Sequence, residues 1–446
     1  MFTKIHRLSP EILILLSFAL VILTGALLLM LPFATYAPGC ADFRDTLFTA
    51  VSATCVVGLV VKDTATTWTW FGQAVILTMI QIGGMGFITV TILFAIISGR
   101  KIGLFHRILM KNSISAPQIG GIIRLTGFIL KAVLVIEAIA AVLMMPFFIS
   151  NFGLKGIWYA IFHSISAFCN AGFDLFGTRE NYSSLTTCAF DPMINIVIML
   201  LIIIGGIGFM TWDDVMKYKL KFRKYHLQSK LAILTSALLI ILPAIFYFCY
   251  EFTRTTWGDL TLSERIYASI FQAVTPRTAG FNTVDLSAMT PVSRAIMMVL
   301  MLIGGSPGST AGGLKTTTIA VLLLGMIASF AKKENIEILG RRITDSTVRY
   351  ASTIFLMYVT LFSVGGCIIS VADHVSLSRS LFESASAIGT VGLTLGLTPG
   401  LGMVSRTVLV ILMYLGRVGP LTLVYASHAS RVQNISKMPV ENINVG

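Results

Sequence analysis

A short motif returns four times along this chain at an almost constant spacing. Each copy begins with Phe, carries Ser or Thr four residues later, and contains Gly followed by Leu or Phe near its end. The copies are FTAVSATCVVGL (48–59), FHSISAFCNAGF (162–173), FQAVTPRTAGFN (271–282) and FESASAIGTVGL (382–393). Their glycines, Gly58, Gly172, Gly280 and Gly392, are 114, 108 and 112 residues apart. A period this regular indicates four copies of one structural unit.

A second glycine mark follows each copy. It stands as QIGGMGF around Gly83, IIGGIGF around Gly205, LIGGSPG around Gly304 and LGRVG around Gly416. Each unit therefore reads as span, short apolar segment, glycine-centred turn and span, and successive units enter from the same side, unlike the inverted repeats of many transporters. The predicted regions are 1–112 (repeat 1, VVGL), 113–225 (repeat 2, NAGF), 226–342 (repeat 3, TAGF, second span broken at 304–313), 343–432 (repeat 4, TVGL, inner helix with Arg417) and a cytoplasmic tail, 433–446.

Composition places these units in a membrane. The chain is 55% hydrophobic and 12% charged, with a mean hydropathy of +0.85, which lies outside the range of soluble domains. Eight apolar runs come near or exceed the roughly 20 residues that span hydrocarbon as helix. The runs cover 12–31, 74–97, 122–149, 194–210, 231–250, 295–330 with an interruption, 350–371 and 404–425.

The segments between paired spans, such as 42–53 and 263–273, are too short to cross a bilayer. Irregular backbone at membrane depth survives only where it is buried in protein or lines a water-filled cavity. The sequence therefore predicts an all-α polytopic membrane protein with four parallel helix–pore-loop–helix repeats around a pseudo-fourfold pore. A half-helix in each repeat would direct its C-terminal dipole, and the following strand its carbonyls, at a cation. The predicted cation-binding residues are Val56, Val57, Gly58, Asn170, Ala171, Gly172, Thr278, Ala279, Gly280, Thr390, Val391 and Gly392.

The net charge is +13, and the positions of the Lys and Arg residues along the chain match the predicted topology. About 20 of the 33 Lys and Arg fall in alternate connections: the N-terminus, 100–124, 217–230, 332–349 and the tail. The positive-inside rule then places both termini in the cytoplasm, and nothing indicates nucleic-acid binding. The basic segments 100–111 and 217–224 suit either anionic membrane lipids or a cytosolic protein. On the opposite side Asp63, Asp174, Asn282 and Asp285 line an acidic outer vestibule or are ordinary solvated loop residues.

The four motifs also resemble the motifs of a known protein family. TVGL, VVGL, NAGF and TAGF look like degenerate forms of the potassium-channel filter signature. The single-chain arrangement of four units resembles the Trk/Ktr/HKT superfamily, and within it the membrane pore subunits of Ktr potassium uptake systems. The resemblance implies K⁺ uptake across the plasma (inner) membrane, with K⁺ at filter carbonyls, Na⁺ open as an activator and no organic cofactor. It also implies a homodimer seated on a KtrA-like cytosolic ring of nucleotide-binding regulatory subunits.

The second span of repeat 3 is interrupted by GGSPGSTAGG (304–313), whose Gly and Pro content prevents a continuous helix. By the resemblance this is an intramembrane gate loop; the alternative is a kinked packing helix. A nucleotide-binding loop is excluded, because Leu314 precedes Lys315 and no strand comes before the segment. The predicted gate residues are Gly305, Ser306, Pro307, Gly308, Ser309, Thr310, Ala311, Gly312, Gly313, Lys315 and Arg417.

Arg417 stands in an apolar run, where an unpaired charge costs roughly 2.5 to 3.5 kcal/mol. Arg417 lies 25 residues after Gly392, as Gly305 does after Gly280. Arg417 and Gly305 should therefore lie at a similar depth in the membrane. We expect Arg417 either to place a positive charge below the filter, against the loop, or to hold helices together through a cage of carbonyls.

Two other classes of function compete with a potassium pore. A Na⁺- or H⁺-coupled potassium symporter needs carboxylates at an ion site, and Glu137 is the acid that lies clearly within a span. A membrane enzyme is disfavoured, since no spanning Asp pair, His cluster or Ser/Lys dyad is present. Asn170 and Ala171 depart furthest from the Thr-Val-Gly order, which favours weaker K⁺ over Na⁺ selectivity.

Overall fold

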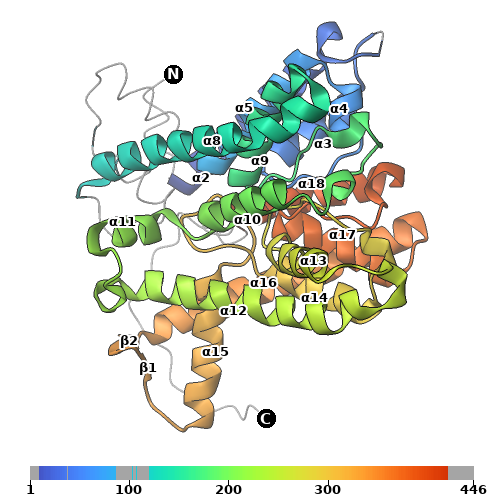
Figure 1. Cartoon of the computed structure of the whole chain (residues 1–446). Helices are drawn as coiled ribbons and strands as arrows, with labels where there is room; N and C mark the ends of the chain where they lie inside the picture. The colour runs from blue at the N-terminus through green and yellow to red at the C-terminus, as the bar shows by residue number, and fades with distance from the viewer. Residues whose placement is uncertain (1–9, 38, 87–102, 104–106, 108–119, 420–446) are drawn as a thin grey trace.

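The computed structural model describes residues 10–37, 39–86, 103, 107 and 120–419 (Figure 1). The predicted cytoplasmic tail, both chain ends and most of the basic segment 100–111 lie outside these residues.

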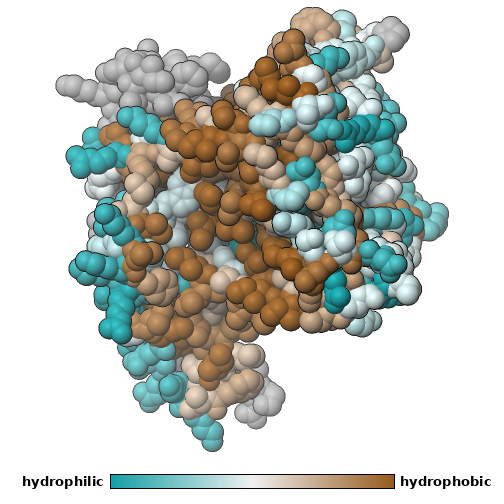
Figure 2. Space-filling view, in the orientation of Figure 1, coloured by the Kyte–Doolittle hydropathy of each residue, from teal (hydrophilic) through white to brown (hydrophobic). Residues whose placement is uncertain are grey.

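Four long apolar helices frame the molecule. They are α2 (Pro10–Leu29), α8 (Ile122–Phe152), α12 (Leu227–Cys249) and α16 (Asp345–Asp373). Within the described residues, these are the four single helices with the length and composition to cross a membrane. Figure 1 shows α8 and α12 running across the body with α10 between them, and Figure 2 shows a hydrophobic band between two hydrophilic edges. A band of this kind matches the hydrocarbon core of a bilayer.

A short helix follows each long one and leads into the motif glycine. The short helices are α3 (Phe43–Thr54), α9 (Lys155–Phe168), α13 (Leu262–Val274) and α17 (Leu377–Gly389). They have 12 to 14 residues, so at about 1.5 Å per residue they reach little more than half-way through hydrocarbon.

A third helix completes each set, and we number the sets units 1 to 4. The third helices are α5 (Trp70–Met85), α10 (Pro192–Gly206), α14 (Pro291–Leu302) and α18 (Met403–Val418). Three begin at polar caps: the side chains of Thr69, Asp191 and Thr290 accept bonds from backbone N–H groups of the first turn.

Helices α5 and α18 end within the predicted spans 74–97 and 404–425, whose residues beyond 86 and 419 lie outside the described ones. In units 1 and 4 the helix ends before Gly86 and Gly419, both with positive φ, where an L side chain would be strained. In unit 2 the straight span predicted over 194–210 is wrong: at Gly208, φ +97°, α10 gives way to α11 (Phe209–Tyr218) with a bend of 96°. In unit 3 the predicted break is present between Leu302 and Thr316.

The four units close into a ring. The third helix of each unit packs on the short helix of the next one: α5 on α9, α10 on α13, α14 on α17, and α18 back on α3. The predicted all-helical, pseudo-fourfold architecture is confirmed, and the short helices converge on one axis inside the ring.

The remaining elements are small or peripheral. α15 (Thr316–Phe330) projects from the body (Figure 1) and leads into an antiparallel hairpin of β1 (Ile336–Ile338) and β2 (Arg341–Ile343). α4 (Thr64–Thr67) follows the first motif. Single 3-10 turns are η1 (Pro32–Ala34), η2 (Phe176–Thr178), η3 (Thr186–Cys188), η4 (Phe222–Lys224), η5 (Glu251–Thr253), η6 (Thr255–Trp257), η7 (Leu286–Ala288) and η8 (Thr398–Gly400).

Candidate functional site

The four motif strands share one unusual backbone conformation. In each strand the residue two positions before the glycine has positive φ, although none of these residues is Gly. The residues are Val56 (57°), Asn170 (58°), Thr278 (69°) and Thr390 (54°), and the glycines follow at 91°, 67°, 79° and 94°. L residues adopt this region at a cost of roughly 1 to 2 kcal/mol. Such strain persists where the surrounding structure enforces it, and it clusters at functional sites.

The four glycines meet at the axis. A Cβ atom placed on Gly58 would lie 2.5 Å from the carbonyl oxygen of Ala171, and one on Gly172 would lie 2.8 Å from the oxygen of Ala279. Cβ atoms on Gly280 and Gly392 would lie closer still to the oxygens of Val391 and Val57. Each glycine thus faces the carbonyl that precedes the next glycine, and the fourth returns to the first. Four strands distant in sequence form one ring of backbone carbonyls.

The Ser or Thr of each motif holds its strand to its short helix. The hydroxyl oxygens of Ser52 and Ser386 accept bonds from the N–H groups of Gly58 (3.1 Å) and Gly392 (3.0 Å). In units 2 and 3 the same hydroxyl donates instead: Ser166 to Phe173 O (2.7 Å) and Thr275 to Phe281 O (2.5 Å). The recurring hydroxyl therefore orients the backbone at the ring.

A cavity of about 330 Å³ opens on one side of the ring, and all four glycines line it. Asp63, Asp174, Asn282 and Asp285 line it, so the vestibule arrangement is the one the structure adopts. Asp63 also caps α4 and accepts a bond from the Tyr182 N–H at 3.0 Å. Burial raises the pKa of Asp174 to about 7, and the negative charge of Asp63 adds to the rise.

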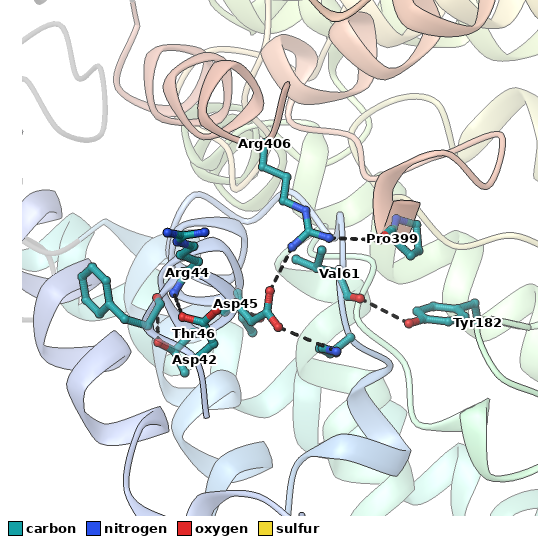
Figure 3. A network of polar contacts seen from close by, with 11 residues as sticks. Asp42, Arg44, Asp45, Thr46, Val61, Tyr182, Pro399 and Arg406 are labelled. Atoms are coloured by element: carbon teal, nitrogen blue, oxygen red, sulfur yellow. Dashed lines mark hydrogen bonds and ion pairs between the residues drawn. The ribbon is translucent and has the colours of Figure 1, made fainter. Parts of the chain in front are cut away.

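A polar network joins unit 4 to unit 1 (Figure 3). Arg406, near the start of α18, donates to Asp45 of α3 at 3.0 Å and to the carbonyl of Pro399 at 3.0 Å. Lys62 lies 3.8 Å from the other oxygen of Asp45. The partly buried ion pair of Arg406 and Asp45 joins the first and last units, and removing either partner would leave an unpaired charge that is costly to bury.

The broken segment of unit 3 lies on the side of the ring away from this cavity. Its two ends pair with each other, with Gly304 N–H donating to Leu314 O (2.8 Å) and Leu314 N–H to Leu302 O (3.2 Å). A Cβ on Gly313 would lie 3.0 Å from the carbonyl oxygen of Gly389, the residue before Thr390. The loop therefore sits directly against the inner end of the fourth motif strand.

Residues of unit 2 form hydrogen bonds with this loop at several positions along it. The N–H groups of Ser306 and Thr310 donate to Gly206 O (2.9 Å) and Gly205 O (3.2 Å), and the Thr310 hydroxyl donates to Phe168 O (3.1 Å). In return the Phe209 N–H donates to Gly308 O at 2.7 Å.

Arg417 joins the loop to two further units. Its guanidinium donates to the carbonyl of Thr310 in the loop and to the carbonyls of Gly83 and Gly84 at the end of α5, the last at 3.0 Å. Lys315 donates to Ala311 O (2.8 Å) and Gly312 O (3.3 Å) within the loop. Arg417 contacts the loop, as expected. It also bonds to carbonyls of two other units, which is the arrangement expected if it holds helices together.

Gly208 and Phe209 were missed by sequence reasoning. A Cβ on Gly208 would lie 2.8 Å from Pro307 O, so the bend of unit 2 is shaped to the loop. The available signal was the third glycine of IIGGIGF, which matches Gly86 and Gly419 in units 1 and 4.

The described residues contain no group of three or more His, Cys, Asp or Glu able to hold a metal ion. The ring offers backbone carbonyls to a cation, and the cavity beside it adds the carboxyl groups of Asp63, Asp174 and Asp285.

Comparisons with known proteins agree with this architecture. The family model described as "TrkH: Cation transport protein" matches residues 17–433. The chain is 42% identical to the potassium/sodium uptake protein NtpJ of Enterococcus hirae, over 99% of this chain and 98% of the relative. It is 38% identical to the Ktr system potassium uptake protein B of Bacillus subtilis, over 96% and 95% of the two chains.

A solved structure has the same fold. The crystal structure of the potassium transporter TrkH from Vibrio parahaemolyticus matches with a TM-score of 0.69 and 19% identity, over 91% of this chain and 83% of that one. The predicted family resemblance is confirmed: the chain belongs to the TrkH family of cation transport proteins.

Proposed function

We propose that this chain takes up K⁺ across the plasma membrane through the ring of carbonyls formed by its four motif strands. The observation that carries the proposal is the closed ring of Gly58, Gly172, Gly280 and Gly392. Stacked carbonyls replace the hydration shell of a permeating cation, and the C-terminal ends of four short helices add partial negative charge. The relatives named for potassium or potassium/sodium uptake support K⁺, with Na⁺ as a second ion or an activator.

The loop of unit 3 is proposed as the gate on the inner side of this filter. Its paired ends isolate residues 305–313 as a unit that can move without unravelling α14 or α15. Backbone bonds to unit 2 and the guanidinium of Arg417 hold it beneath the ring. Arg417 also brings a positive charge to this position, which opposes the entry of cations while the loop is in place.

Passive permeation is favoured over coupled transport. Glu137, the acid within a span, belongs to α8, and its buried carboxylate accepts a bond from Gln81 of α5 at 3.2 Å. This bond holds the carboxylate to the third helix of unit 1.

The projecting helix α15 supports a proposal about assembly. Leu323, Met326, Ile327 and Phe330 are exposed along one stripe of α15, spaced as neighbours on a helix face. We propose that this stripe packs in a homodimer, and that a cytosolic nucleotide-binding ring moves the loop. The name "Ktr system" of the second relative supports a multi-component assembly. Both termini are proposed to be cytoplasmic.

The first experiment measures K⁺ and Na⁺ flux into liposomes that contain the purified chain, with a K⁺ gradient and no Na⁺ or H⁺ gradient. We expect K⁺ uptake that continues until the membrane potential balances the K⁺ gradient. A requirement for a Na⁺ or H⁺ gradient would contradict the pore proposal and favour a symporter.

The acidic vestibule predicts a pH dependence of uptake. The carboxyl of Asp174 has a pKa raised to about 7, so lowering external pH through 7 neutralises it and reduces the attraction of the vestibule for K⁺. We expect uptake at sub-saturating K⁺ to fall severalfold between about pH 8 and pH 6. Asp174→Asn should remove this step and Asp285→Asn should leave its midpoint in place; a step that survives Asp174→Asn assigns it to another group.

A further inference from the structure

The residue directly after the Phe of each motif differs in chemistry from unit to unit. These residues are Thr49, His163, Gln272 and Glu383, and each is at most 1% exposed. They occupy one position on the buried face of the four short helices, behind the motif strands. Buried polar groups at equivalent positions need hydrogen-bond partners, and the partners reveal a shared role.

In three units the side chain bonds to the strand two or three residues beyond the glycine. His163 Nε2 accepts from the Leu175 N–H at 3.3 Å, and because Nδ1 faces the carbonyl of Tyr159 at 2.7 Å, Nδ1 carries the proton. Gln272 Nε2 donates to Thr283 Oγ1 at 3.2 Å. Leu175 and Thr283 each stand three residues after their glycine.

Glu383 makes the largest set of these contacts. One oxygen accepts from the Leu395 N–H at 3.2 Å and from the Thr394 hydroxyl, and the other accepts from the Thr398 hydroxyl at 2.7 Å. Leu395 is again the third residue after the glycine. Hydrogen bonds to a carboxyl group are among the strongest in proteins when that group is ionised.

In unit 1 the strand is held by a side chain from the neighbouring unit. The Thr49 hydroxyl donates to Asp45 O within its own helix at 2.8 Å and does not hold the strand. Instead the Tyr182 hydroxyl, from unit 2, donates to the carbonyl of Val61 at 3.2 Å (Figure 3). Val61 is the third residue after Gly58, so all four strands are anchored at equivalent positions.

We propose that His163, Gln272, Glu383 and Tyr182 are positioning residues that set K⁺ over Na⁺ selectivity by anchoring the outer ends of the four strands. The inference rests on the proposed filter. A carbonyl ring discriminates between K⁺ and Na⁺ through the number and freedom of its carbonyls. The strained strands keep their shape only where surrounding contacts enforce it. Glu383, with three contacts, contributes most.

The test compares the ratio of K⁺ to Na⁺ flux in liposomes for four variants of the full chain. Glu383→Ala should lower the ratio about tenfold and Tyr182→Phe about threefold, in keeping with the number of bonds lost. Glu383→Gln should stay within about twofold of the native ratio, because an amide can bond to the same partners. Thr49→Val is the matched control at the same buried position and should leave the ratio unchanged, because its hydroxyl does not hold a strand.

Gly392→Ser, measured beside them, separates this inference from the filter proposal. A ratio lowered by Gly392→Ser but not by Glu383→Ala or Tyr182→Phe overturns the anchoring role alone. A ratio that none of the three alters overturns the filter as well. An equal fall in Glu383→Ala and Thr49→Val would show that the ratio does not depend on a bond to the strand and would also overturn the inference. If Glu383→Ala fails to fold, as judged by size-exclusion chromatography, the comparison of Tyr182→Phe with Thr49→Val decides.

Discussion

Replacing Gly392 by Ser is expected to reduce K⁺ over Na⁺ selectivity by about tenfold or more. The backbone at Gly392 has a φ of +94°, which an L residue rarely adopts, and a Cβ there would collide with the carbonyl oxygen of Val57. Either the Val57 carbonyl or the fourth strand must move, so the ring loses its spacing. The measurement is the ratio of K⁺ to Na⁺ flux in liposomes.

The four glycines should not respond equally. The space for a Cβ is least at Gly280 and Gly392, greater at Gly58 and greatest at Gly172, so serine substitutions should affect selectivity in that order. Gly258→Ser is a matched control: its φ is +67° and nothing lies within 4 Å of its Cβ position, so it introduces backbone strain far from the ring. Equal effects at Gly258 and Gly392 would show that strain and not ring geometry is responsible.

Removing residues 308–312 is expected to raise K⁺ flux about tenfold or more while selectivity is retained. The deletion takes away the loop contacts with Gly205, Phe209 and Arg417, each worth about 1 kcal/mol. It leaves the bonds between Gly304 and Leu314 and between Leu314 and Leu302, which close the stem from α14 to α15. Flux should rise because the barrier under the filter is gone, and selectivity should persist because the four glycines and the hydroxyls of Ser52, Ser166, Thr275 and Ser386 that orient their strands all lie outside the deleted residues.

Arg417→Gln provides a milder version of the same test. It removes the positive charge yet keeps an amide able to donate to Thr310 or Gly83, so we expect a smaller increase in K⁺ flux. Arg341→Gln, at an exposed position of the hairpin, removes the same charge outside the cavity that Pro307 lines and should have no effect on flux. If neither the deletion nor Arg417→Gln alters flux, the segment is a packing element and not a gate.

Local pattern was enough to predict much of this protein. Apolar runs, the lengths of the short segments and the repeated Phe-to-Gly motif are read within one unit, and the long helices, the short helices and the strained glycine turns follow from them. The break of unit 3 was predictable for the same reason, since the Gly and Pro of 304–313 prevent a helix whatever surrounds them.

The bend of unit 2 was not predictable in this way. Gly208 resembles Gly86 and Gly419 in sequence, yet its conformation is matched to Pro307 and Gly308, which lie about a hundred residues away. The partners of Arg417 were likewise not predictable from the sequence, because a guanidinium can donate to any carbonyl that the fold brings near it.

The sequence by itself determined a membrane protein of four parallel units, each with a glycine at the head of an irregular strand, because helix length, hydropathy and backbone freedom are local properties. Tertiary structure alone decided which carbonyl each glycine faces, how Glu383, His163, Gln272 and Tyr182 anchor the strands, and which units hold the loop. Those contacts join residues that are brought together only when the fourth unit closes on the first, and ring closure leaves no mark within any single stretch of the chain.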